Sequence, residues 1–219
     1  NPPFCFLIYV YAASQLLSWS FPPSLIVQKI SAPNEPALTL DVWRDSGHII
    51  PRVKKIAAPH LVNSWTNIPH VTNHDEADIT EMEEFRSSLK DNYSGEKIKI
   101  TPLAFIIKAL VISLKKFPSF NSSIDDIENG KITFKKYFHI GIAVDTQHGL
   151  MVPKIRDANR KDIKDLSKDL KKVSDDCRNL KIDKKEFFGG SMTITSLGGI
   201  GGSFFTPIIN FPEVAILGI

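Results

Sequence analysis

The segment from Asp162 to Leu180 most constrains the fold, because it has the pattern of one long amphipathic helix between strands. Its apolar residues recur at steps of three and four, and Lys and Asp fill the other positions. Such spacing puts one apolar stripe along a helix, so the stripe is expected to face a core. The stripe consists of Ile163, Leu166, Leu170, Val173, Cys177 and Leu180.

Strand patterns lie on both sides of this helix and predict a mixed α/β domain. Residues 139–146 and 150–155 alternate or run apolar around the turn Gln147-His148-Gly149, which predicts a hairpin. Residues 191–196 and 213–219 predict two more strands, and residues 131–134 predict a short one. The expected fold is therefore a mixed sheet with flanking helices.

The first part of this domain predicts a helix followed by a strand. Residues 52–65 have a helical pattern, but Pro59 should break or kink that helix. Residues 68–80 read as an extended strand that carries His70 and His74 on one face. Acidic residues follow, yet neither cysteines nor an H-E-x-x-H helix accompany the two histidines, so no metal is expected.

Two helix starts come next. Thr80 and Glu83 have the spacing of a capping box, for a helix that ends near Lys90. The pair Thr101-Pro102 is a strong start signal, and the apolar helix after it should be buried and end at Pro118.

Residues 1–48 differ from the rest and are left unassigned as a poorly ordered tail. The apolar run at residues 4–17 is shorter than the roughly 20 residues of a membrane span, and no basic residue precedes it. A proline-rich stretch follows, as in linkers. A membrane anchor at residues 4–17 is the alternative, but no membrane partner is expected.

Charge and cysteine content exclude several classes of protein. The net charge is only +3 and the lysines are dispersed, so nucleic acid is not an expected partner. Cys5 and Cys177 match neither a disulfide framework nor a metal-site spacing, which favours a reducing compartment. Cys177 lies on the apolar stripe and is interpreted as a packing residue.

The glycine-rich segment "SMTITSLGGIGG" at residues 191–202 is not a nucleotide loop. It lacks the Lys of a P-loop and the third glycine of a dinucleotide fingerprint. Its chemistry lies in Thr195 and Ser196, hydroxyl residues at a strand end beside a loop that a substrate can approach. Such hydroxyls suit an oxyanion donor.

Four motifs, in order and spacing, resemble the catalytic domain of 2-oxoacid dehydrogenase acyltransferases, over about residues 49–219. Details such as "FNSS" and "PEVAILG" resemble the acetyl-transferring members, the dihydrolipoamide acetyltransferases of pyruvate dehydrogenase complexes. The motifs are "NIPHVTNHDEADITEMEEFR", "ITPLAFIIKALVISLKKFPSFNSSI", "KKYFHIGIAVDTQHGLMVPKIRD" and "MTITSLGGIGG…FTPIINFPEVAILG".

The resemblance implies a chloramphenicol-acetyltransferase-like fold, assembled as homotrimers within a larger core. Coenzyme A and a lipoyl arm are its substrates. The lipoyl group would come from a lipoyl domain, and contacts with the E1 and E3 components from domains that these residues do not include. The implied location is the cytoplasm of a bacterium or the matrix of a mitochondrion.

The resemblance also implies site residues. The family's oxyanion serine falls on Thr195, because Ser196 should point to the other face of the strand. Residues matching substrate-binding positions are Arg52, Asn121, Ser122, Gly198 and Gly199.

The family's general base lies in a D-H-R-x-x-D-G motif downstream of "PEVAILG", and the given residues stop at Ile219. Loss of a general base costs about 10²–10⁴ in rate. The expectation is a fragment, incomplete at its C-terminus, with little or no transferase activity. A non-catalytic scaffold or degenerate homologue is the alternative.

Overall fold

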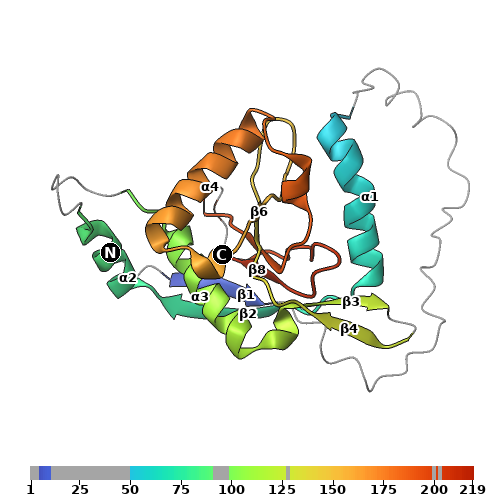
Figure 1. Ribbon diagram of the computed structural model, residues 1–219, viewed down its shortest axis with the longest axis horizontal. Helices are drawn as coiled ribbons and strands as arrows, with labels where there is room; N and C mark the ends of the chain where they lie inside the picture. The colour runs from blue at the N-terminus through green and yellow to red at the C-terminus, as the bar shows by residue number, and fades with distance from the viewer. Residues whose placement is uncertain (1–4, 11–49, 91–98, 127–128, 199–200, 202–203) are drawn as a thin grey trace, which may run out of the picture.

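A computed structural model describes residues 5–10, 50–90, 99–126, 129–198, 201 and 204–219 (Figure 1). Its centre is a six-stranded mixed sheet in the order β2-β1-β8-β7-β5-β6. Strands β5, β7 and β8 run parallel, whereas the remaining neighbours pair antiparallel. The strands are β1 (Cys5–Val10), β2 (Asn73–Asp78), β5 (Ile140–Ile142), β6 (Lys154–Ile155), β7 (Met192–Thr195) and β8 (Ile216–Gly218).

Helices and a two-stranded ribbon complete the fold. The α-helices are α1 (Arg52–Asn67), α2 (Thr80–Ser88), α3 (Pro102–Lys116) and α4 (Ile163–Arg178). The ribbon pairs β3 (Ser122–Asp126) with β4 (Lys131–Phe134) in antiparallel fashion. Short 3-10 turns cover Pro118–Phe120, Ala158–Arg160 and Lys184–Phe187. None of the described helices is long and apolar enough to cross a membrane.

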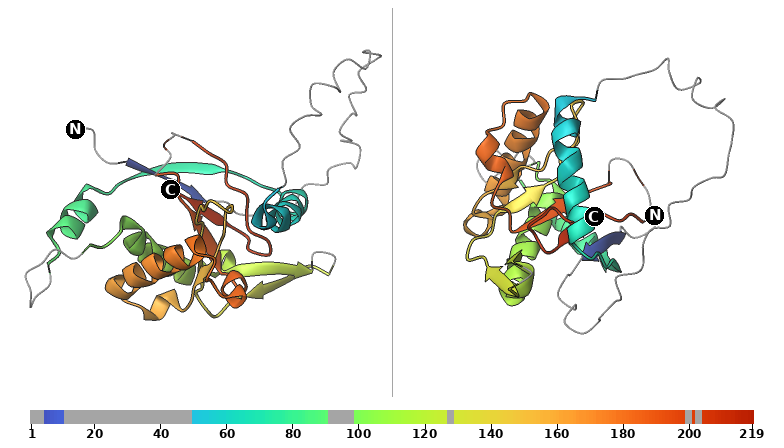
Figure 2. Two further views of the ribbon diagram at one scale, coloured as in Figure 1. Left: turned by 90° about the horizontal axis from the view of Figure 1, so that it is seen from above. Right: turned by 90° about the vertical axis from the view of Figure 1, so that its right-hand side faces the viewer.

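The main core lies between the sheet and the pair of helices α3 and α4, which run across the same face (Figures 1 and 2). From β7, the side chains of Met192 and Ile194 enter this core. Because side chains alternate along a strand, Thr193 and Thr195 project from the opposite face. Strand β7 therefore presents apolar side chains to the main core and hydroxyl groups to the opposite face, where Ile216 and Ile209 form a second, small apolar cluster.

Helix α4 confirms most of the pattern that predicted it, but it ends at Arg178, and Leu180 lies beyond it and is 53% exposed. Asp162 is its N-cap, and the carboxylate accepts a hydrogen bond from the Asp165 amide at 2.7 Å. Leu166, Leu170 and Cys177 are buried. Burial raises the pKa of the Cys177 thiol to about 11, so the thiol stays protonated and packs like a small apolar group.

Two local predictions in the first part of the domain are wrong. Pro59 does not break the first helix: α1 continues through it, although the Lys55 carbonyl loses its usual amide donor. The capping box also fails, because Thr80 is already helical and Ile79 is the N-cap. Asp78 instead accepts bonds from the amide and hydroxyl of Thr80, at 2.9 and 2.6 Å.

The other predicted strands are confirmed, most of them shorter than expected. Helix α3 is also confirmed, but only one of its faces is buried, and Ile112 is 66% exposed. Thr101 precedes α3 with Pro102 at its first position, and Phe117 ends it before Pro118. Strand β3 is an addition, since its sequence had suggested no strand. Within residues 1–48 the structure describes only Cys5–Val10, as β1, so the division at residue 48 stays a prediction.

Candidate active site

Thr195 ends β7 and is held by β8 on the main chain. Its Cα pairs with Gly218, and its carbonyl accepts a hydrogen bond from the Ile219 amide at 2.9 Å. The Leu197 amide returns a bond of 2.9 Å to the Ile219 carbonyl. The half-buried Thr195 thus has a fixed main chain at a strand end, and its side chain lies on the sheet face opposite α3 and α4.

Ser196 lies just beyond the strand and is exposed. Its Oγ accepts a hydrogen bond from the Gly198 amide at 3.3 Å, which shapes the turn. Gly201 follows with a φ of +88°, a conformation that favours glycine. Because the Ser196 hydroxyl is engaged in this local turn, we favour Thr195 as the oxyanion donor. Gly199 lies outside the described residues.

A buried polar cluster adjoins β7 on the same face as Thr195. The Lys154 Nζ donates to Glu213 Oε1 at 2.7 Å, and the two side chains are 1% and 2% exposed. The Thr193 hydroxyl donates to Glu213 Oε2 at 2.6 Å. These residues link β6 and β7 to the segment before β8.

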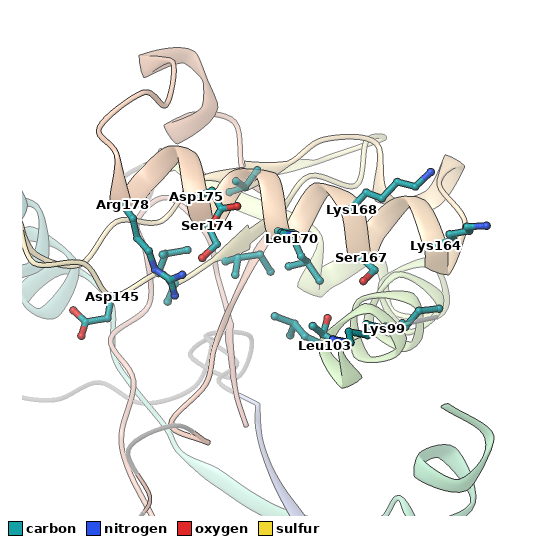
Figure 3. A pocket seen from close by; sticks show the side chains of 17 residues that line it. Lys99, Leu103, Asp145, Lys164, Ser167, Lys168, Leu170, Ser174, Asp175 and Arg178 are labelled. Carbon is teal, nitrogen blue, oxygen red and sulfur yellow. The ribbon is translucent and has the colours of Figure 1, made fainter. Parts of the chain in front are cut away.

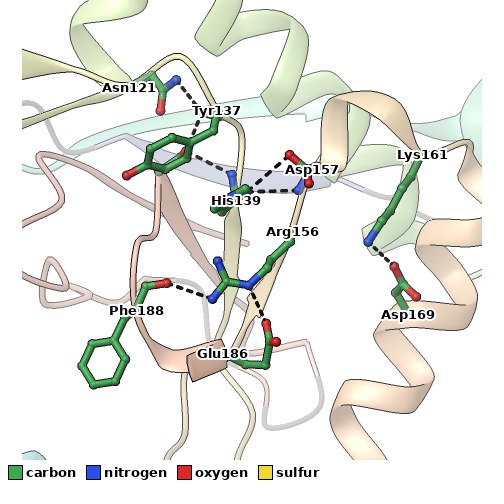
Figure 4. Close-up of polar contacts among 10 residues, drawn as sticks. Asn121, Tyr137, His139, Arg156, Asp157, Lys161, Asp169, Glu186 and Phe188 are labelled. Carbon is green, nitrogen blue, oxygen red and sulfur yellow. Dashed lines mark hydrogen bonds and ion pairs between the residues drawn. The ribbon is translucent and has the colours of Figure 1, made fainter. Parts of the chain in front are cut away.

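The first substrate-binding candidates, Asn121 and Ser122, brace the chain near this cluster. The Asn121 amide donates to the carbonyls of Lys135 and Tyr137 at 2.9 and 3.0 Å (Figure 4). Its Oδ1 is buried without a hydrogen-bond partner among the described residues. The Ser122 hydroxyl donates to the Ser119 carbonyl at 2.6 Å. Their roles toward substrate stay predictions.

Arg52 is not joined to Thr195 by any contact among the described residues. It is the exposed first residue of α1. The next two residues, Val53 and Lys54, lie against Gly149 in the turn between β5 and β6. In the resembling family, the matching arginine pairs with the aspartate of the D-H-R-x-x-D-G motif, and for Arg52 that pairing stays a prediction.

The two histidines of the considered metal site have other contacts. The Ile209 amide donates to His70 Nε2 at 3.0 Å, so Nδ1 carries the proton and donates to the Ile68 carbonyl at 2.6 Å. His74 meets the ring of Phe204 edge-on. Across the described part of the chain, no three His, Cys, Asp or Glu side chains gather as metal ligands.

His139 is likewise occupied within the fold. Its ring stacks on Tyr137, and its Nδ1 accepts a hydrogen bond from the Asp157 amide at 3.0 Å (Figure 4). Burial lowers the pKa of His139, an effect that the Asp157 carboxylate partly opposes and Arg156 reinforces. The neutral imidazole therefore acts as a structural acceptor.

A groove of about 820 Å³ lies between α3 and α4, on the helical side of the sheet (Figure 3). Its floor includes Ile142, Leu103 and Leu170, and its rim carries Lys164 and Arg178. None of the predicted site residues lines it. Because the hydroxyl of interest projects from the opposite face, we place the candidate chemistry at Thr195 and not in this groove.

Sequence reasoning missed the cluster of Lys154 and Glu213. A signal was present: each is a lone charge within an apolar segment, "LMVPKI" and "FPEVAILG". Charged side chains are almost never fully buried unless they are paired. Two opposite charges, each embedded in an apolar segment, therefore indicate a buried pair.

Comparisons with known proteins agree with this geometry. The family model of the 2-oxoacid dehydrogenases acyltransferase catalytic domain matches residues 46–219. The dihydrolipoyllysine-residue acetyltransferase component of pyruvate dehydrogenase complex from Cupriavidus necator is 50% identical over 168 residues. That match covers 77% of this chain but only 30% of the relative, so the chain spans less than a third of that protein.

Two solved structures are also similar. Dihydrolipoamide acetyltransferase from Azotobacter vinelandii, studied for the roles of a serine, a histidine and an asparagine in its mechanism, matches with a TM-score of 0.77 and 40% identity. The match covers 85% of this chain and 76% of that one. The cubic core of a pyruvate dehydrogenase multienzyme complex matches with a TM-score of 0.76 and 40% identity, over 85% and 77%. The chain has the expected chloramphenicol-acetyltransferase-like fold and belongs to the 2-oxoacid dehydrogenase acyltransferase catalytic-domain family.

Proposed function

We propose that this chain is the catalytic domain of a dihydrolipoamide acetyltransferase, which moves an acetyl group between dihydrolipoamide and coenzyme A within a pyruvate dehydrogenase complex. The carrying observation is Thr195, which ends β7, is held by β8 through its main chain and has its half-buried side chain on the face opposite the main core. The relatives that carry this activity in their names support the proposal.

The reaction needs a thiolate, an oxyanion donor and a base. The thiolate of one substrate attacks the thioester carbonyl, a new C–S bond forms, and the carbonyl oxygen becomes an oxyanion. Thr195 Oγ–H donates to that oxygen, and this interaction is strongest in the transition state. The tetrahedral intermediate then collapses, the original C–S bond breaks, and the departing thiolate takes up the proton that the first thiol released.

The general base is assigned from the resemblance alone. Three described histidines have ring nitrogens engaged elsewhere in the fold: His60 with Asn210, His70 with backbone groups, and His139 with the Asp157 amide. We assign the base, as the resemblance implies, to the family's D-H-R-x-x-D-G segment. A purely scaffolding role is the second candidate function.

Coenzyme A and the lipoyl group enter as substrates. Gly198 and Gly199 would let the thioester and pantetheine approach the main chain. Asn121 and Ser122 are assigned to the acetyl-specific part of the site, and Arg52 to a structural ion pair with the downstream segment. The lipoyl group arrives on a separate domain, and the E1 and E3 components bind through other parts of the protein.

We further propose a homotrimer that assembles into a larger core in the cytoplasm, or in the mitochondrial matrix if the source is eukaryotic. The structural neighbour is itself a cubic core. Helix α1 exposes large apolar side chains: Ile56, Val62 and Trp65. Apolar surface of this kind marks protein–protein contacts.

The test uses the full-length natural protein that contains this chain. Acetyl-CoA and dihydrolipoamide are supplied, and formation of acetyl-dihydrolipoamide is followed together with free coenzyme A. The proposal expects turnover in equal amounts of both products. A full-length protein that assembles into a large particle but forms neither product would instead establish the scaffold.

A further inference from the structure

We infer that Lys154, Glu213 and Thr193 form a positioning cluster that fixes the strand segment carrying Thr195. These side chains do not touch the reacting atoms; they act through β7. The inference rests on the proposed function, because it concerns the hydroxyl assigned to the oxyanion. It gives a role to three residues that lie within the quoted motifs but to which the resemblance assigned none.

The Glu213 carboxylate is the centre of the cluster. Its Oε1 accepts from Lys154 Nζ at 2.7 Å and from Asn210 Nδ2 at 3.1 Å, while its Oε2 accepts from Thr193 Oγ1 at 2.6 Å. Lys154 Nζ also lies 3.4 Å from the Thr193 hydroxyl. One carboxylate thus joins β6, β7 and the segment that leads into β8.

The backbone around the cluster is shaped to hold it. A Cβ on Gly141 would lie 2.5 Å from Thr193 Oγ1 and 2.7 Å from Lys154 Nζ. A Cβ on Gly190 would collide with Glu213 and lie 2.8 Å from Lys154 Nζ. Two glycines on different segments therefore leave the space that the lysine fills.

Stability alone does not account for such a pair. Desolvation of two charges offsets most of their attraction, and apolar residues of similar volume often serve stability as well or better. The charged cluster instead orients a side chain, because the Glu213 carboxylate accepts a hydrogen bond from the Thr193 hydroxyl and so restrains it. Thr193 and Thr195 project from the same face two residues apart, so that restraint acts on the strand that aims the catalytic hydroxyl.

The glutamate is also restrained from its own main chain. Glu213 forms an isolated antiparallel bridge with Ser123 at the start of β3. Its amide donates to the Asn210 carbonyl at 3.0 Å. Both the main chain of Glu213 and its carboxylate are therefore held in place, which a positioning role requires.

The experiment removes both charges together in the full-length protein, as Lys154→Met with Glu213→Gln. This pairing avoids leaving one buried charge alone, so the thermal midpoint should stay within a few degrees of the wild type. The matched control is Lys161→Met with Asp169→Asn, which removes an ion pair of 2.6 Å on the half-exposed surface (Figure 4). The measured quantities are kcat, KM for each substrate and the thermal midpoint.

We expect the cluster variant to lose about tenfold in kcat with KM changed less than about twofold, since a misaimed oxyanion donor affects the transition state alone. The surface control should keep the wild-type kcat. The decisive measurement repeats the cluster variant in a Thr195→Ala background, where the loss should shrink below about twofold because the hydroxyl to be aimed is gone.

The outcomes separate the two proposals. If Thr195→Ala is impaired but the cluster variant costs the same factor in both backgrounds, the cluster does not act through Thr195 and this inference is overturned. An unchanged kcat in the cluster variant overturns it as well. If Thr195→Ala itself turns over like the wild type, the assignment of the hydroxyl under the proposed function fails first.

Discussion

Thr195 has a β-methyl group that the serine implied by the resemblance would lack, so its hydroxyl must act with a stiffer χ1. We predict that Thr195→Ala lowers kcat by about 10²–10³ with little change in KM, as loss of one oxyanion donor does. Thr195→Ser should keep most of the activity, because it retains the hydroxyl. Steady-state kinetics of acetyl transfer measure both.

Ser196→Ala is the matched control for that prediction. Its hydroxyl is exposed and its described contact is the Gly198 amide, so kcat should stay close to that of the wild type. If Ser196→Ala lost much of its kcat while Thr195→Ala kept the wild-type kcat, the oxyanion donor would be Ser196 instead of Thr195.

His139 makes stability depend on pH, because burial lowers the pKa of its imidazole below the ordinary 6.5. The unfolded chain takes up the proton first as pH falls, so the free energy of unfolding decreases below about pH 6.5 until the folded pKa is passed. We predict that the wild type loses more stability than His139→Gln between about pH 7.5 and about pH 5.5.

Urea unfolding at both pH values measures that difference. An equal pH dependence in the two proteins would show that His139 is not the group responsible. The Asp157 carboxylate partly opposes the effect of burial, so its removal by Asp157→Asn should make the pH dependence of the wild type steeper.

The start of helix α4 is fixed by one side chain. The Asp162 carboxylate caps it through the Asp165 amide, and we predict that Asp162→Ala lowers the free energy of unfolding by about 0.5–2 kcal/mol. Lys172→Ala, on the exposed face of the same helix, should change it by less than about 0.5 kcal/mol. Denaturant titrations compare the two, and equal effects would contradict the capping role.

Elements with a strong local period could be predicted from sequence. The apolar spacing and the N-cap residues predict helices α3 and α4, and the apolar pattern predicts strands β7 and β8. Strand β3 could not, because "SSIDD" has no apolar alternation and forms by pairing with β4. The prediction of a helix break at Pro59 failed because it too ignored distant contacts. Helix α1 is held by hydrogen bonds to Asn210 and Phe211, which outweigh the one hydrogen bond lost at the proline.

The site could be predicted only in part. Thr195 follows from a motif beside a strand, whereas the pair Lys154–Glu213 spans 59 residues and depends on which strands become neighbours. Spacing along the chain does not contain that information. The sheet order, in which β1 stands between β2 and β8, is likewise set by pairing between distant segments.

At the scale of the whole molecule, the proposed assembly makes a prediction. The full-length protein should behave in light scattering as a particle many times the mass of one chain. Trp65→Lys, on the exposed apolar face of α1, should reduce that mass if this face lies in an interface. Lys172→Gln, on the exposed face of α4, serves as the control and should leave the mass of the particle unchanged. A monomeric wild-type protein would contradict the assembly.

The space beside Lys154 also restricts how such a sequence can arise. A Cβ at residue 141 or at residue 190 would lie 2.7 or 2.8 Å from Lys154 Nζ, so a side chain at either position would push the end of the lysine from its place beside Glu213. A change at either glycine therefore favours a compensating change at residue 154. The three positions should vary together among related sequences.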